Sequence, residues 1–207
     1  MALRASERTR RKGKAATTPR RRNAEATRQA ILRSAREAFV RSGYDGAGVR
    51  EIAAGAGVTA MLVNRYFGSK EQLFAEVLTS VMSDPVILTR ETLTSPNAAR
   101  IAASLVDITR QDTRPLDGFL IMHRSGSSPR AADIGREQID KRYQKILAPA
   151  LGGKHAQERA ALLISIVAGV QIMRQGMGLP ALAKADPEIL TRLLASAIAP
   201  LLDPKSA

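Results

Sequence analysis

The sequence contains no cysteine and no tryptophan, and only two of its 207 residues are histidine. Without cysteine the chain forms no disulfide bond and has no thiolate for catalysis or metal binding. His123 and His155 are far apart in the sequence, and neither has a second histidine nearby, so we expect no metal site. Nucleophile-elbow, phosphate-binding glycine-loop and paired-histidine motifs are also missing. We therefore expect neither an enzyme nor a cofactor.

Aromatic side chains are scarce as well, at 3% of the residues, although 44% of the residues are hydrophobic. Five of the seven aromatic residues lie between positions 39 and 74: Phe39, Tyr44, Tyr66, Phe67 and Phe74. This clustering predicts a small N-terminal unit with an aromatic core of its own. The remainder of the chain has enough leucine, isoleucine, valine and alanine for a larger core.

Positive charge is concentrated at the N-terminus. The formal net charge is +13, and residues 1–22 hold nine Lys or Arg residues against the single Glu7. This segment has no apolar periodicity, so we expect a disordered basic arm that neutralises DNA phosphates and enters the minor groove. A solubilising tail, a transit peptide, and a start codon placed too far upstream are alternatives.

Residues 45–74 have the apolar spacing of two short helices joined by a tight turn. The first period comprises Val49, Ile52 and Ala53, and the second comprises Val58, Leu62, Val63 and Phe67. Gly55 and Gly57 supply the backbone freedom that a sharp corner requires. Thr59 is expected to cap the second helix, and Ser69 opens a third with a capping box. This arrangement presents the middle helix to a DNA major groove.

Longer helices flank this unit. The first is predicted from Asn23, its cap, to Ser42, with Gly43 as its stop and Ile31, Ala35, Ala38 and Phe39 on its buried face. The helix after Ser69 is predicted to run from Lys70 to about Ser83, where Asp84 and Pro85 end it.

Several segments in this order and spacing resemble the DNA-binding domain of TetR-type bacterial transcriptional repressors. They are Gly43–Asp45, Val49–Ala53, Ala56–Thr59 and Tyr66–Phe74, together with Ile31, Ala35 and Phe39. The resemblance implies an all-α fold, with an N-terminal three-helix domain that carries the helix-turn-helix and a larger C-terminal domain for ligand binding and dimerisation. We place the N-terminal domain at residues 23–83 and the C-terminal domain at residues 84–207.

The resemblance also implies a function. We expect a cytoplasmic, nucleoid-associated homodimer that binds double-stranded DNA at a palindromic operator, represses transcription and is released by a small-molecule effector. A protein that coats DNA with little sequence preference, driven by the basic arm, is the alternative.

The outward face of the middle helix supplies most of the expected DNA contacts. The candidates are Thr27, Gly48, Arg50, Thr59, Ala60, Met61, Asn64, Arg65, Tyr66 and Lys70. Ala60 and Met61 suit thymine methyl groups, Arg65 suits guanine or a phosphate, and Lys70 suits a phosphate. Tyr66 is alternatively a core aromatic, and Arg50 a solvated helix residue.

Three positions depart from the usual TetR pattern. Hydroxyl residues are usual where this chain has Ala47 and Gly48, and tyrosine is usual where it has Asn64. Gly48 can still act as a weak helix cap, and Asn64 can still donate a hydrogen bond to a phosphate.

From residue 86 onward the pattern predicts helix after helix. Helices are expected to open at Ser95–Pro96, Pro115, Pro129 and Asp186–Pro187, and the one after Pro129 is closed by Pro149 and Gly152. The most apolar run, residues 160–173, lies in a helix of about residues 155–175. It is too short to cross a bilayer and is bracketed by Arg159 and Arg174, so we expect no membrane contact.

This apolar helix is hydrophobic nearly all round. Together with the last helix, about residues 187–202, it is predicted to form a four-helix dimer interface, with plain core packing as the alternative. An effector pocket is expected among the helices of residues 97–175. Candidate lining residues are Phe119, Met122, His123, Tyr143, Gln171 and Arg174. Core or surface packing is an alternative for each, and His123 also fits a polar surface.

Overall fold

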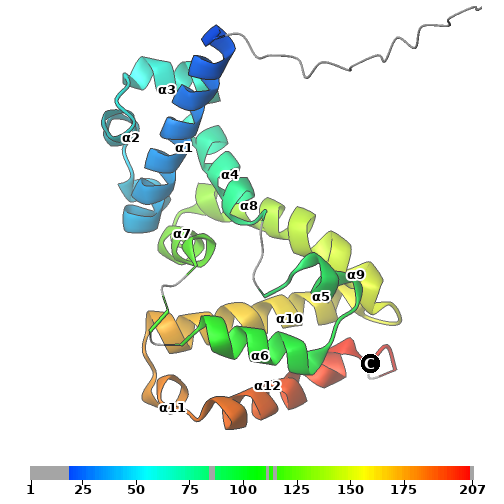
Figure 1. Ribbon diagram of the computed structural model, residues 1–207. Coiled ribbons are helices and arrows are strands. Elements are labelled where there is room, and N and C mark those ends of the chain that lie inside the picture. Colours follow the sequence, from blue (N-terminus) through cyan, green and yellow to red (C-terminus); the bar gives the residue numbers. More distant parts are fainter. Residues whose placement is uncertain (1–18, 84–86, 111, 114–115, 206–207) are drawn as a thin grey trace, which may run out of the picture.

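A computed structural model of the chain describes residues 19–83, 87–110, 112–113 and 116–205. Residues 1–18 of the predicted arm of residues 1–22 lie outside this range, whereas residues 19–22 are helical and not disordered as expected. Every regular element in the described residues is helical. The N-terminal helices are α1 (Pro19–Gly46), α2 (Val49–Gly55), α3 (Ala60–Phe67) and α4 (Lys70–Val81). They form the smaller end of the molecule, and α4 leads from it toward the rest (Figure 1).

The remaining chain folds into a second group of helices. These are α5 (Arg90–Thr94), α6 (Ala98–Ile108), α7 (Asp117–Ser125), α8 (Pro129–Ile139), α9 (Lys145–Leu151), α10 (Ala156–Gln171), α11 (Pro180–Ala183) and α12 (Pro187–Leu202). Two π-helical segments, η1 (Asp140–Gln144) and η2 (Ile172–Gly176), continue α8 into α9 and extend α10. In Figure 1, α6, α10 and α12 form the layer farthest from α1 to α3.

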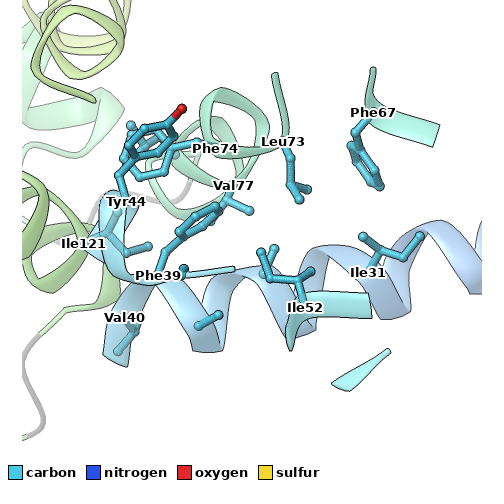
Figure 2. Packing of buried hydrophobic residues seen from close by; sticks show 14 of the residues in the cluster. Ile31, Phe39, Val40, Tyr44, Ile52, Phe67, Leu73, Phe74, Val77 and Ile121 are labelled. Atoms are coloured by element: carbon cyan, nitrogen blue, oxygen red, sulfur yellow. The ribbon is translucent and has the colours of Figure 1, made fainter. Parts of the chain in front are cut away.

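The first core is built around the predicted aromatic cluster. The Phe74 ring packs edge-on against the rings of Phe39 and Tyr44, with centroids 5.0 Å apart in both pairs. Figure 2 shows these rings with Ile31, Ile52 and other apolar side chains of the N-terminal helices. Buried residues of α7 and α8 belong to the same core: Ile121, Ala131 and Ile134. The aromatic core was therefore predicted correctly, but it also includes part of the C-terminal half.

The second core joins α6, α9, α10 and α12. Its fully buried side chains include Ile101, Leu105, Leu147, Leu163 and Ile198. As the sequence predicted, this core holds isoleucine, leucine, valine and alanine, with Tyr143 packed at its edge.

A buried arginine, Arg159, holds the ends of two helices of this second core together. The Arg159 guanidinium donates to the carbonyls of Lys154, Gly152, Leu201 and Asp203, near the ends of α9 and α12. The cation thus lies where the helix macrodipoles are negative, which compensates for its burial.

The apolar helix agrees with the predicted helix of about residues 155–175, but it extends beyond the apolar run from which its membrane contact was excluded. Ala156–Gly176 spans 21 residues, so by length and composition alone it is sufficient to cross a membrane, and only 28% of its most apolar window is buried in the protomer. The argument from length was therefore wrong. Arg159 and Arg174 bracket the apolar run from within the helix, as predicted, and both are buried in the protein.

Several predicted helix boundaries also require correction. α1 begins at Pro19, four residues before Asn23, and its helical geometry breaks at Gly43, where φ is 66°. Pro149 lies inside α9, and the helix ends two residues later, before Gly152 with φ 56°. The expected boundaries at Asp84–Pro85 and Pro115 lie outside the described residues. α4 ends at Val81 and α7 begins at Asp117.

Candidate nucleic-acid interface

The corner between α2 and α3 depends on two glycines that act differently. Gly57 has φ 68°, and no atom lies within 4 Å of where its Cβ would be, so it serves the backbone conformation alone. Gly55 is not in the positive-φ region, so conformational freedom was the wrong explanation for it. A Cβ there would lie 2.4 Å from Ser34 Oγ, which donates to the Ile52 carbonyl at 2.8 Å. Gly55 therefore permits the close approach of α1 and α2.

Side-chain caps fix the starts of α3 and α4, and α3 ends at Gly68, whose N–H donates to the Asn64 carbonyl at 2.7 Å. Thr59 Oγ1 accepts from the Leu62 N–H at 3.3 Å, and Ser69 Oγ accepts from the Gln72 N–H at 3.2 Å at the start of α4. Both hydroxyl caps confirm the sequence prediction, but the capping box expected at Ser69 is only half formed, because the Ser69 N–H donates to the Phe67 carbonyl at 2.9 Å. Val63 and Phe67 are buried beneath the helix, so its orientation is set by the first core.

The opposite face of α3 is open to solvent. The Met61 side chain is 81% exposed, and Thr59, Asn64 and Arg65 are also exposed. Ala60 and Tyr66 are half-buried, and the Tyr66 ring lies 6.4 Å from that of Phe67. The face thus combines an apolar tip with amide and guanidinium donors, which are the groups that contact base edges and phosphates.

The start of α2 borders this face. Gly48 is the N-cap, and its N–H donates to Glu51 Oε2 at 3.4 Å, a weak cap of the kind expected. Glu51 also pairs with Arg41, and the hydrogen bond from that guanidinium is the main reason why the pKa of Glu51 is lowered. Arg50 is exposed beside this cap. This leaves its charge available to a ligand.

Thr27 lies on α1 and is half-buried. Its hydroxyl donates to the Asn23 carbonyl at 2.9 Å, which leaves the oxygen free to accept rather than donate. Arg28 pairs with Glu76 of α4 and lies 4.9 Å above the Phe67 ring. The Arg28 side chain therefore ties α1 to α3 and α4.

Lys70 is half-buried at the start of α4. Its Nζ lies 4.6 Å from the centroid of the Tyr44 ring, a cation–π geometry. Burial, followed by the charge of Glu71, raises the pKa of Tyr44, so the ring beneath the ammonium stays neutral. Tyr44 thus restrains the ammonium of Lys70, the first residue of α4, and the N-terminal amides of that helix also favour an anion.

The six candidate pocket residues do not form one cluster. Met122 packs against the first core, whereas Tyr143 packs against the second, where burial raises its pKa. Phe119 and His123 stack on each other with centroids 5.8 Å apart. The Arg174 guanidinium donates hydrogen bonds to the Val106 and Leu182 carbonyls and to the Thr109 hydroxyl. Gln171, three residues before Arg174, is also buried.

The close contact between α7 and α1 was not predicted from the sequence. Ser125 Oγ of α7 accepts from the Tyr44 N–H at 2.9 Å, and the Arg124 guanidinium donates to the Val40 carbonyl. Arg36 of α1 pairs with Asp117 at the other end of α7. These contacts join residues about 80 positions apart, which no local sequence pattern predicts. They connect the first core directly to the C-terminal half.

Comparison with known proteins agrees with this geometry. The family model described as bacterial regulatory proteins, tetR family, matches residues 31–77. That of the tetracyclin repressor-like C-terminal domain matches residues 98–202. A search of the curated proteins found no significant match.

Solved structures of regulators share the fold. A transcriptional regulator from Rhodococcus sp. Rha1 is 27% identical over 84% of this chain and 95% of its own, with a TM-score of 0.59. A TetR-family regulator from Streptomyces coelicolor A3 is 24% identical over 92% of this chain and 99% of its own, with a TM-score of 0.55. NalD, the secondary repressor of the MexAB-OprM multidrug efflux pump in Pseudomonas aeruginosa, is 20% identical over 85% of this chain and 96% of its own, with a TM-score of 0.57.

The two family models cover both the capped helix-turn-helix and the helical C-terminal half, and regulators of this kind are not enzymes. The chain belongs to the TetR family and is a DNA-binding transcriptional regulator.

Proposed function

We propose that this regulator is a repressor that binds a palindromic operator as a homodimer and leaves it when a small-molecule effector binds. The observation that carries the proposal is α3 itself. It is capped at both ends, anchored by Val63 and Phe67, and exposed along the face that holds Met61 and Arg65. A rigid helix presented in this way suits the major groove.

The proposed contacts have different roles. Thr59, Ala60, Met61, Asn64 and Arg65 face base edges from α3. Phosphate contacts come from Thr27, Gly48, Arg50, Tyr66 and Lys70, which surround that face on α1, α2, α3 and α4. The basic arm of residues 1–22 adds phosphate neutralisation that is independent of sequence.

The proposed dimer is formed by α10, with its extension η2, and α12. Six of the eight exposed large hydrophobic side chains in the described residues lie between positions 162 and 193: Leu162, Met173, Met177, Leu179, Ile189 and Leu193. A second copy of the chain related by a two-fold axis would cover them and complete a four-helix interface. The same face explains why so apolar a helix is only partly buried in a single chain, without any membrane contact.

The proposed domains, residues 23–83 and 84–207, divide DNA binding from effector binding and dimerisation. Effector binding in the C-terminal half would reach the DNA-binding helices through the contact of α7 with α1. A ligand releases the operator only if it binds one arrangement of the two α3 helices more tightly than the other. We place this activity in the cytoplasm, at the nucleoid.

Footprinting of the DNA upstream of the gene tests this proposal. Changing both Arg65 and Lys70 to alanine should abolish the protected palindrome, because each residue supplies a base or phosphate contact. Arg136→Ala removes an exposed arginine from α8 and is the matched control, which should protect the site normally.

Excess random DNA separates a repressor from a protein that coats DNA. A protected palindrome that survives the competitor supports the repressor, since specific binding is typically at least 10³-fold tighter than non-specific binding. Native protection by the double variant, or uniform loss of protection with competitor, would contradict the proposal.

A further inference from the structure

Two buried amide atoms on the same helix have no hydrogen-bond partner among the described residues. They are Nε2 of Gln171, whose side chain is only 6% exposed, and Oε1 of Gln175. A buried donor or acceptor that forms no hydrogen bond is unfavourable, and native proteins contain few of them. Here a donor and an acceptor occur four residues apart, which places them on neighbouring turns of one helix face.

The orientation of the Gln175 amide is set by its surroundings. Its Nε2 donates to the Ile108 carbonyl at 3.1 Å and to Thr113 Oγ1 at 3.2 Å. The Thr113 hydroxyl donates in turn to the Ile108 and Arg110 carbonyls. Because the Ile108 carbonyl and Thr113 Oγ1 both need a donor, the amide nitrogen of Gln175 must face them. Its Oε1 therefore points away from them and has no donor.

The backbone at this point is also unusual. The α-helix gives way at Ile172 to the π-helical turn η2, which ends at Gly176. Such turns are rare and occur frequently at functional sites. A Cβ at Gly176 would lie 3.8 Å from Cζ of Phe119, so the Phe119 ring lies close to this turn. Phe119 also stacks on His123, with 9° between the ring planes, so an aromatic ring held on one face lies beside η2.

Among the described residues, the charged groups near this turn already have partners: Arg110, whose charge acts on Arg174, pairs with Asp112. Arg174 is buried, and its guanidinium already donates to the carbonyls of Val106 and Leu182 and to the Thr109 hydroxyl. A charged ligand would therefore lose its hydration without gaining an ion pair. A neutral ligand that offers one acceptor and one donor would instead satisfy both glutamine atoms.

We propose that Gln171 and Gln175 recognise the effector, and that the effector is a neutral, flat molecule with an amide-type edge, such as a lactam or a ureide. Its carbonyl accepts from Gln171 Nε2, its N–H donates to Gln175 Oε1, and its ring lies toward Phe119. This inference rests on the proposed function, because it names the chemistry of the effector that releases the operator.

Thermal unfolding of the full-length protein without ligand is the first test. Gln171→Met keeps the side-chain volume but removes the unpaired donor, so it should raise Tm by about 2–4 °C. The control is Gln138→Met, because Gln138 is similarly buried, at 9% exposed, but its Oε1 accepts from the Thr79 hydroxyl at 3.0 Å. That change should lower Tm. A fall in Tm for Gln171→Met would show that the amide is satisfied structurally and would overturn the proposal.

Calorimetric titration with three probes of similar shape is the second test. These are 2-quinolone, which has the amide edge, naphthalene, which lacks it, and 2-naphthoate, which is charged. Wild-type protein should bind 2-quinolone at least tenfold more tightly than the other two, and Gln171→Met should lose about this factor. Equal affinity for the three probes, no uptake of any of them, or an unchanged preference in Gln171→Met contradicts the proposal. Operator binding by ligand-free protein is measured separately, so failure here leaves the proposed DNA-binding function intact.

Discussion

At the scale of single residues, the contact of Gly55 with Ser34 determines how closely α1 and α2 approach. We expect Gly55→Ala to lower the free energy of unfolding by about 1–3 kcal/mol, because its Cβ would lie 2.4 Å from Ser34 Oγ. Ser34→Ala should cost about 1 kcal/mol, through loss of the hydrogen bond to the Ile52 carbonyl.

The double variant makes this prediction specific. Once Ser34 Oγ is removed, the nearest remaining atom, Ser34 Cβ, would lie 3.5 Å from the new methyl group, an ordinary contact. The double variant should therefore be less destabilised than the sum of the two single variants, measured by urea denaturation. Simple additivity would mean that Gly55 is required for another reason.

The roles of single residues were predictable where each residue interacts with its neighbours in the sequence. Thr59 and Ser69 cap helices that begin one residue later, and a hydroxyl before an apolar period is sufficient to predict this. The role of Gly55 was not predictable, because Ser34 is 21 positions away. Gln171 was selected from the sequence, but Gln175 was missed. The spacing of four between two glutamines on an apolar helix was the available signal.

At the scale of elements, α7 is attached to α1 through a buried backbone group. The Tyr44 N–H donates to Ser125 Oγ, so Ser125→Ala would leave this donor without its partner. We expect a loss of about 1–3 kcal/mol in the free energy of unfolding and faster hydrogen exchange at the Tyr44 amide. Ser127→Ala, an exposed neighbour, should change neither quantity. Unchanged exchange at Tyr44 in Ser125→Ala would argue against the link between α7 and α1.

A helix was predictable where its own sequence contains a cap residue and an apolar period. The last helix was expected at residues 187–202 and is α12, with Asp186 capping the N–H groups of Glu188 and Ile189. Neither α5 nor α11 was predicted, because helices of five and four residues are too short to show a period. The π-helical segments were also missed, since they arise from tertiary packing rather than from a sequence motif.

At the scale of the whole molecule, the exposed apolar face of α10 and α12 is the feature that the protomer leaves unexplained. Leu193 of α12 is 61% exposed and Leu162 of α10 is 53% exposed. Water-exposed side chains of this size on adjoining helices are typical of a subunit interface. The buried faces of the same helices hold the second core, so both faces are apolar for different reasons.

Replacing Leu162 and Leu193 together by glutamate should therefore convert the proposed dimer into a folded monomer. Two carboxylates per protomer would have to be buried without partners in the interface, at several kcal/mol each, whereas in the monomer they remain in water. Sedimentation at micromolar concentration should give the mass of one chain, with unchanged helical circular dichroism and much weaker protection of a palindromic operator. Ile146→Glu is the matched control, because Ile146 is an exposed apolar residue of α9, outside the proposed interface, and its variant should stay dimeric. A double variant that remains dimeric would place the interface elsewhere, and one that unfolds would show that these side chains belong to the core of the protomer.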